Sequence, residues 1–509
     1  MKPNWFLRVN VVAALTLLVV LAEIAGCEPQ KVVVWSADGS SAAVIGGDGL
    51  YLCDSDGKLS DLIEPKAKQA AWVANTRKLI VETVTEAAKW KDVEPYLGDA
   101  RRNQIVQTAG QWLEKAMAFK GTWKELQSWA GQEMETINME DAVLMFLYVR
   151  DNRSEGLAQK FGADWQKAAA ESVDVTRLQV LDVAKVLSGG RALAGPVIAI
   201  STGGFAELAV SPNGQALVAG VADSRTEGTC VLWAMPTDGK RPPVKVAEMA
   251  GRYPAWSADG HWLVYGQANP PRGKSGDSPR LGTLRRLELG EDGGRLKANP
   301  PLDEDKSVTN ADGSVTNTYS PAQVLAGFVY SEWMRIHCTK DGRVLFASPQ
   351  VTLPATADDM PTRQTLFAVD PGKRATVTRV LTRQAEEQLP DAVNQFQLSP
   401  DETRVAIPGT GGQVSVVTLA DSTVTEVREK KGKDSPRMVP VWRNNQELCF
   451  AAPNDGEAAK KRAGEVVLWS SAGVRAISKA WPDEVVKGLK DQDRGPEKVE
   501  VKEPEKKEK

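Results

Sequence analysis

Residues 256–265 read WSADGHWLVY. An aromatic residue leads into the polar turn Ser-Ala-Asp-Gly, and an apolar run follows. Asp followed by Gly tolerates the positive φ that a tight hairpin turn needs, and the flanking aromatic and β-branched residues favour strands. The stretch therefore predicts two strands joined by a tight turn. Nearly the same phrase, WSADGSSAAV, occupies residues 35–44, which indicates a repeat.

The same strand–turn–strand pattern occurs seven times along the chain. Its turns are centred on Asp38, Asn75, Asn213, Asp259, Asp341, Asp401 and Asn444. A third and a fourth strand often follow, as in GTCVLWAMPTDGK at 228–240 and VKVAEM at 244–249. Four antiparallel strands per repeat form the blade of a β-propeller.

The spacing of the turns agrees with this interpretation. Three of the intervals are 37, 46 and 43 residues, close to the period of about 40–50 that propeller repeats show. The other intervals, of 138, 82 and 60 residues, leave room for inserts. We expect an all-β fold, a β-propeller over residues 27–482 with seven four-stranded blades. Six or eight blades are the alternatives.

These phrases resemble the WD40-like (PD40) repeats of TolB-type β-propellers. The best matches are residues 35–44, 208–218, 256–264 and 398–406. Pro212 and Pro400 retain the proline of that repeat, whereas Ala37 and Ala258 replace it. TolB-type proteins bind partners in the periplasm, so the resemblance implies a similar role. It does not imply the same partner, because TolB has a different second domain and no lipid anchor, and the fold hosts many functions.

Residues 84–176 interrupt the β pattern and predict three or four helices inserted between the second and third strands of blade two. Ile105, Ala109, Trp112, Leu113 and Ala116 fall at helical spacing and form one apolar stripe. Asn138 is the expected N-cap of a later helix.

The segment also holds five of the fifteen tryptophans, which either build its core or form an exposed aromatic patch. Trp123 and Trp129 lie in a shorter, less regular stretch. They are therefore the candidate contacts for a partner.

The N-terminus predicts export and lipidation. Lys2 and Arg8 precede an apolar run at 11–22, which is shorter than the ~20 residues that span a bilayer and has the length of a signal-peptide core. The following Ile-Ala-Gly-Cys resembles the bacterial lipobox. We therefore expect residues 1–26 to be a lipoprotein signal peptide and Cys27 to be lipidated, an ordinary secretory signal or a buried helix being the alternatives.

The predicted location is the bacterial cell envelope. Glu28 is not the Asp that retains some lipoproteins at the inner membrane, so the periplasmic face of the outer membrane is favoured. The first strand starts a few residues after Cys27, which would hold the folded body close to the membrane. Residues 483–509 contain nine acids and eight bases and almost no apolar side chains, so we expect a disordered charged tail.

The sequence offers little catalytic material. The net charge of −3 gives no sign of a nucleic-acid partner, and only two histidines are present. No G-x-S-x-G, P-loop or H-E-x-x-H motif occurs. His337 and Cys338 are neighbours whose side chains would point to opposite faces of a strand. We expect no metal, no cofactor and no disulfide, with Cys53, Cys230, Cys338 and Cys449 as buried thiols.

The leading functional hypothesis is a non-catalytic, membrane-anchored scaffold that binds envelope proteins of unknown identity. The alternatives are an envelope carbohydrate-active enzyme and a sensor that binds a glycan or small molecule in the propeller channel. Clustered Arg, Tyr and carboxylate groups at the channel mouth would favour an enzyme. A plain polar lining with an apolar patch on the insert would favour a binding module.

Overall fold

The structure is a computed structural model. It describes residues 32–133, 137–226, 228–269, 280–292, 295–299, 307–309, 315–317, 324–349, 351–353, 364–371, 376–389, 393, 395–409, 412–428, 438–453 and 464–486. None of the helices in these ranges combines the length and apolarity needed to cross a membrane. The predicted signal peptide and Cys27 lie outside the described residues.

Most of the chain forms antiparallel sheets whose strands follow one another in sequence. The first sheet contains β1 (Val33–Trp35), β2 (Ser41–Ile45), β3 (Gly49–Asp54) and β4 (Glu64–Pro65). The second contains β5 (Ala67–Trp72), β6 (Lys78–Thr85), β7 (Val175–Asp182) and β8 (Leu193–Ser201).

Three more four-stranded sheets occupy the C-terminal part of the chain. One contains β20 (Ile336–Cys338), β21 (Val344–Ser348), β23 (Thr365–Asp370) and β24 (Thr376–Arg379). The next contains β25 (Gln397–Leu398), β26 (Arg404–Pro408), β27 (Val414–Thr418) and β28 (Val424–Arg428). The last contains β29 (Val441–Trp442), β30 (Leu448–Pro453), β31 (Gly464–Ser470) and β32 (Gly473–Ala476). The short helix α8 (Arg383–Gln388) precedes β25.

The middle of the chain differs from the expected separate blades, because its strands form one curled sheet of ten. It contains β9 (Ala209–Val210), β10 (Ala216–Ala222), β11 (Cys230–Pro236), β12 (Val244–Ala250), β13 (Ala255–Trp256), β14 (Trp262–Ala268), β15 (Leu281–Asp292), β16 (Arg295–Asn299), β19 (Val324–Val329) and β22 (Val351–Leu353). The sheet is continuous because a single residue pair, Ala250 with Gln267, joins β12 to β14. β17 (Ser307–Thr309) and β18 (Val315–Asn317) form a separate hairpin.

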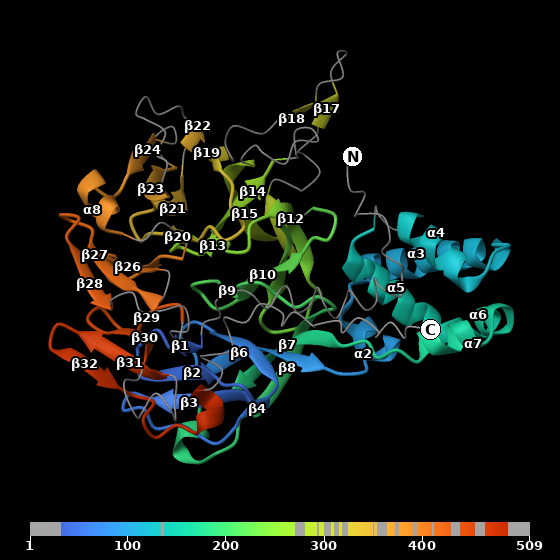
Figure 1. The fold of residues 1–509 in the computed structure, drawn as a ribbon, viewed down its shortest axis with the longest axis horizontal. Coiled ribbons are helices and arrows are strands. Elements are labelled where there is room, and N and C mark those ends of the chain that lie inside the picture. The colour runs from blue at the N-terminus through green and yellow to red at the C-terminus, as the bar shows by residue number, and fades with distance from the viewer. Residues whose placement is uncertain are drawn as a thin grey trace, which may run out of the picture.

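The first strands of these groups surround a common axis, which is the arrangement of a β-propeller (Figure 1). β1 contacts β5, β5 contacts β9, β9 contacts β13 and β13 contacts β20. β25 contacts β29, and β29 contacts β1, so the last sheet meets the first. Later strands of each group, such as β24, β28 and β32, lie at the periphery. The prediction of a β-propeller is therefore confirmed.

In three of the strand groups, the tryptophan of the repeat fastens the group to the one before it. The indole Nε1 of Trp72 donates to Val34 O (2.8 Å), and that of Trp256 donates to Ala209 O (2.9 Å). Trp442 makes the same bond, of 3.0 Å, to Gln397 O. Each acceptor lies on the first strand of the preceding group. The Trp of the repeat thus joins neighbouring groups, and the strand–turn–strand that follows it lies within one group.

The segment between β6 and β7 is helical. It contains α2 (Trp90–Val93), η2 (Glu94–Tyr96), α3 (Asp99–Ala118), α4 (Trp123–Glu133), α5 (Met139–Asn152), α6 (Ser154–Phe161) and α7 (Ala163–Ala169). There are more helices than the three or four expected. Gly162, at φ 52°, breaks the last predicted helix into α6 and α7, and Gly98 separates η2 from α3. Asn138 caps α5 as predicted, its side chain accepting from the Glu140 N–H.

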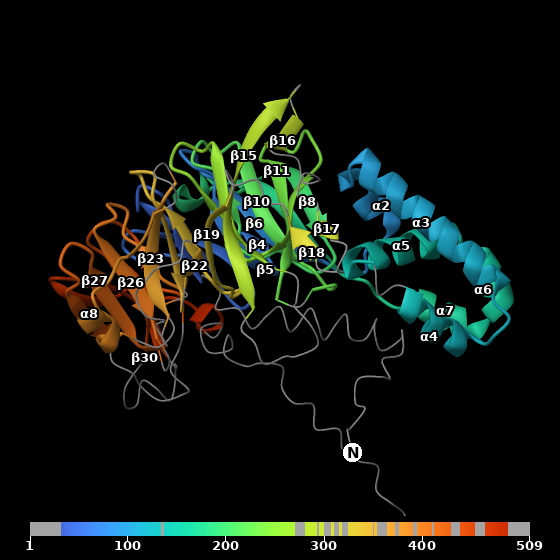
Figure 2. The ribbon, with the colours of Figure 1, turned by 90° about the horizontal axis from the view of Figure 1, so that it is seen from above.

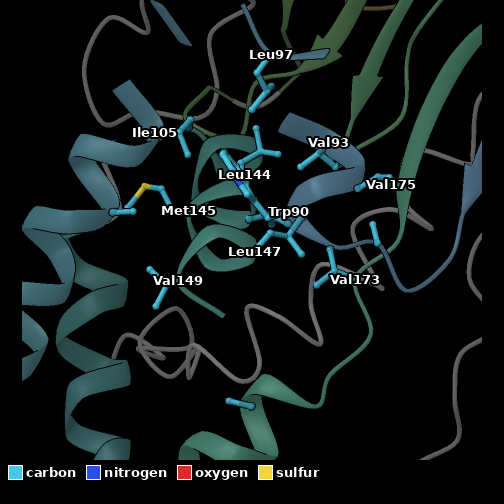
Figure 3. Close-up of a cluster of buried hydrophobic side chains, with 14 of the residues drawn as sticks. Trp90, Val93, Leu97, Ile105, Leu144, Met145, Leu147, Val149, Val173 and Val175 are labelled. Carbon is cyan, nitrogen blue, oxygen red and sulfur yellow. The ribbon is translucent and has the colours of Figure 1, made fainter. Parts of the chain in front are cut away.

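The helical segment has its own apolar core, shown in Figure 3. Trp90, Leu144 and Leu147 are buried there together with Val173 and Val175, which lead back into the sheet. Of the predicted stripe on α3, Ile105, Ala109 and Ala116 are buried, and Trp112 and Leu113 are partly buried. We refer to residues 86–174 as the helical unit.

Candidate functional site

Strand register divides the propeller into two faces. In the second sheet Trp72 pairs with Leu79 across a tight turn, whereas Thr85 pairs with Val175 at the other end, where the helical unit leaves the sheet. The end that carries the tight turns is called the turn face. The opposite end, which carries the helical unit and the starts of the first strands, is called the loop face.

The seven predicted turn residues lie at the turn face, and most of them are hydrogen-bond acceptors that shape the turn. Asp38 Oδ1 accepts from the Ser36 hydroxyl (2.6 Å) and from the Ser40 N–H (3.1 Å). Equivalent bonds pair Asn213 with Ser211, Asp259 with Ser257, Asp341 with Thr339 and Asp401 with Ser399. The Ser36 hydrogen bond is the main cause that lowers the pKa of Asp38 to about 2.

Two turns depart from this pattern. Asn75 itself takes a positive φ of 57°, a role that Gly39 has in the first turn. Asn444 Oδ1 accepts from the N–H groups of Gln446 (2.8 Å) and Glu447 (2.9 Å) in a turn without a preceding Ser. The turn residues therefore have structural roles.

A polar cluster lies at the loop face, where four of the first strands begin. Arg335, directly before β20, places Nη1 3.3 Å from Glu207 Oε1 and donates from Nη2 to Gln395 Oε1 (3.2 Å). Its guanidinium lies 4.4 Å from the centre of the Tyr253 ring. We call Glu207, Tyr253, Arg335 and Gln395 the axial cluster. Because the Arg335 side chain is only 10% exposed, its charge depends on Glu207 for compensation.

A second arginine stands beside the axial cluster. Arg252 Nε lies 3.0 Å from Glu332 Oε2, and its guanidinium lies 4.7 Å from the Trp333 ring centre. The Trp333 carbonyl accepts from Gln395 Nε2 (3.1 Å), which connects this pair to the axial cluster. Planar donors, carboxylates and aromatic rings are thus gathered at one end of the axis, a set of groups able to hold a polar ligand.

The helical unit is fixed to the propeller by a seam of charged and aromatic side chains. Arg101 lies 4.8 Å from the Trp233 ring centre on β11, and its Nη2 lies 3.3 Å from Glu140 Oε1 and 2.7 Å from Asp141 Oδ1. Burial alone would lower the pKa of Arg101, but the two carboxylates raise it. Burial raises the pKa of Glu140, and Arg101 opposes that effect. The Met139 N–H also donates to Ser224 Oγ (2.8 Å).

Trp123 and Trp129 are half-buried within the helical unit, and their role as partner contacts stays a prediction. The Trp123 ring packs against Phe161 and Trp165 at centroid distances of 5.3 and 5.6 Å. Trp129 packs against Phe119 at 5.9 Å. The stretch that looked irregular is the regular helix α4, which turns both rings toward the core.

The remaining sequence candidates have few chemical consequences. The four described cysteines are free thiols; three are buried, but Cys338 is partly exposed. Burial raises the pKa of Cys53, Cys338 and Cys449 to about 12, which suppresses the reactive thiolate. His337 Nε2 lies 3.8 Å from Glu402 Oε1, whereas Cys338 Sγ faces Ala255 O, so the two point apart. Within the described residues no group of three His, Cys, Asp or Glu side chains could hold a metal ion.

Comparison with known proteins adds no assignment beyond the fold. A scan against protein-family models and a search of curated proteins both find no match. Among solved structures, the chain is similar to a putative TolB from Agrobacterium tumefaciens, at 13% identity over 55% of this chain and 83% of that chain, with a TM-score of 0.32.

Two enzymes are also similar. An oligogalacturonate lyase in complex with manganese matches at 12% identity over 76% of this chain and 75% of that chain, with a TM-score of 0.35. Prolyl oligopeptidase B from Galerina marginata matches at 8% identity over 92% of this chain and 53% of that chain, with a TM-score of 0.41. This chain thus spans about half the length of that peptidase. Such low scores leave the function to be argued from the residues.

Proposed function

We propose that this protein is a lipid-anchored envelope protein whose β-propeller is a non-catalytic scaffold for other envelope proteins. The proposal includes seven blades that begin with β1, β5, β9, β13, β20, β25 and β29, and a helical unit inserted in the second blade. The observation that carries it is the Arg101 seam. Because the seam fixes the helical unit to Trp233 and Ser224 of the propeller, the helical unit and the propeller present one rigid surface.

A non-catalytic role is supported by the state of the acidic groups. The turn carboxylates are engaged in hydrogen bonds within their own turns. Glu207 lies 3.3 Å from the Arg335 guanidinium and is therefore engaged in an ion pair. The described part of the loop face thus offers polar and aromatic groups for recognition.

The test is chemical cross-linking and recovery of partners from envelope membranes. One variant would replace residues 87–173 with a short Gly-containing turn between the paired ends of β6 and β7. A matched control would carry Asn445→Ala at the turn face, which leaves the loop face intact. We expect the shortened variant to lose the cross-linked partners and the control to retain them. Equal recovery by both would exclude the helical unit as the recognition element.

The second candidate is an enzyme or sensor that takes a glycan or small molecule at the axis. The axial cluster favours it, since Arg335, Tyr253 and Gln395 converge there with Glu207. The test is release of new reducing ends from envelope polysaccharides by the purified protein, compared with Glu207→Gln. If the parent protein releases reducing ends and Glu207→Gln does not, the enzymatic proposal replaces the scaffold proposal.

A further inference from the structure

We propose that the loop face is the side of the protein that lies against the membrane. The proposal rests on the lipid anchor at Cys27 from the proposed function and adds the orientation of the folded body. It makes the axial cluster and the helical unit membrane-proximal and turns the Asx turns away from the bilayer. The loop face then lies toward the phospholipid headgroups, and the envelope proteins of the proposed function would contact it at the membrane surface.

A series of hydrogen bonds places the entry of the chain on the loop face. The Ile45 N–H donates to Val32 O (2.8 Å), so the first described residue lies level with the end of β2 that is remote from the tight turn. On the same edge, the Lys66 N–H donates to Asp48 O (3.0 Å) at the start of β5. Lys66 Nζ then lies 2.6 Å from Glu86 Oε1 at the root of the helical unit.

The length of chain between the anchor and the fold restricts the orientation. Four residues lie between Cys27 and Val32, and the five steps from one to the other reach at most about 18 Å when fully extended. The turn face lies farther away by the height of the blades. The eight-residue strands β6 and β7, which reach the turn face of the second sheet, rise about 27 Å. The tether is thus too short for the propeller to turn over and bring the Asx turns to the lipid.

The helical unit extends in a direction that suits this orientation. In Figure 2, α4 and α7 lie at the end of the unit remote from the tip of β15 and β16. Exposed side chains there are Met117 at the end of α3, which is 40% exposed, Lys120 in the connection to α4, and Lys124 in the first turn of α4. Ammonium groups beside an apolar side chain suit the headgroup boundary of an anionic membrane.

Fluorescence quenching in vesicles tests the orientation. Single thiols would be introduced by Lys68→Cys at the loop face, Lys124→Cys on α4 and Asn445→Cys at the turn face, all exposed positions. The full acylated protein would be labelled with bimane and inserted into vesicles whose phospholipid carries a headgroup spin label. We expect quenching at positions 68 and 124 and its loss at 445. The parent protein corrects for labelling of the partly exposed Cys338.

The control separates this inference from the proposed function. A Cys27→Ser variant, which cannot be acylated, should neither float with the vesicles nor show quenching at any position. If the parent protein also fails to float, the anchor is wrong and the orientation falls with it. If the parent floats but position 445 is quenched as strongly as positions 68 and 124, the anchor stands and the orientation is overturned.

Discussion

At the scale of single residues, the tryptophan of the repeat has a measurable role. Trp256 donates its indole N–H to Ala209 O on the preceding strand group. Trp256→Phe keeps an aromatic ring but leaves a buried carbonyl without that donor, so we expect a loss of about 1 kcal/mol in the free energy of unfolding. Urea denaturation measures it. Trp262→Phe is the control, because that ring faces Arg286 of its own sheet. If both variants lose the same free energy of unfolding, the loss comes from the smaller ring and not from the hydrogen bond.

The turn aspartates predict a dependence of stability on pH. The folded-state pKa of Asp38 is about 2, below its ordinary value of 3.8. Its contribution is therefore present above pH 4 and is lost as the pH falls toward 2. Asp38→Asn keeps the acceptor oxygen without the charge. The fall in melting temperature between pH 5 and pH 2.5 should be smaller for this variant than for the parent, and parallel falls would contradict the assignment.

Two glycines predict opposite effects of the same substitution. Gly39 has a φ of 65°, and a Cβ there would lie 2.7 Å from Arg443 O. Gly39→Ala should therefore destabilise by more than about 1 kcal/mol. Gly110 lies within α3, where a Cβ would meet nothing within 4 Å, so Gly110→Ala should stabilise by about 0.5–1 kcal/mol. Thermal unfolding measures the stability of both variants. A Gly39→Ala variant more stable than the parent would contradict the close contact between this turn and Arg443.

At the scale of elements, α4 is expected to be part of the helical core. Trp123→Ala removes a half-buried ring from Phe161 and Trp165, and we expect a loss of about 2–3 kcal/mol. Lys124→Ala, on the exposed neighbour, should change stability by less than about 0.5 kcal/mol. Calorimetry distinguishes the two. If Trp123→Ala leaves stability unchanged, Trp123 is not part of the helical core and is a candidate contact for a partner.

The sequence predicts the elements better than it predicts the contacts between them. WSADG phrases and the capping Asn138 are local signals, because the turn and the cap depend on residues within a few positions. The split of α6 from α7 was missed, since a Gly inside a helical pattern does not by itself show that its φ is positive.

The axial cluster was missed for a different reason. Arg335 and Glu207 are 128 residues apart, and their contact exists only because the sheets surround an axis. The one local signal is that Glu207, Arg335 and Gln395 each stand just before the first strand of a repeat. That position predicts the face of the propeller but not which side chains meet. Exposure of Trp123 could not be predicted either, because it depends on how α4 packs.

At the scale of the whole molecule, the ring is closed by side chains and by the C-terminal segment. The β1–β4 and β29–β32 sheets are each built from consecutive strands, so within the described residues the first and last sheets share no strand. Arg443 Nε donates to Gly39 O (3.0 Å), and the Arg443 guanidinium lies 5.1 Å from the Trp35 ring centre. Trp481 Nε1 donates to Gly57 O (2.7 Å) across the same junction.

The chain remains packed beyond the predicted start of the charged tail at residue 483. Val485 and Val486 are buried with Trp481 against the first sheet, and the Gly47 N–H donates to Glu484 O (3.3 Å). The rest of the predicted tail lies outside the described residues. Residues 477–486 therefore act as a clasp between the first and last sheets.

Truncation tests the clasp. A chain that ends at Ala476 loses four apolar side chains of the junction, Ile477, Trp481, Val485 and Val486, and the Trp481 hydrogen bond. We expect a loss of several kcal/mol, since burying each such side chain contributes about 1.5–3 kcal/mol. A chain that ends at Val486 keeps the clasp and should unfold at the temperature of the parent. If the two truncations unfold alike, the Arg443 contacts and the packing of β29 on β1 hold the ring without the clasp. If only the longer one keeps the parent's stability, the last ten packed residues close the propeller.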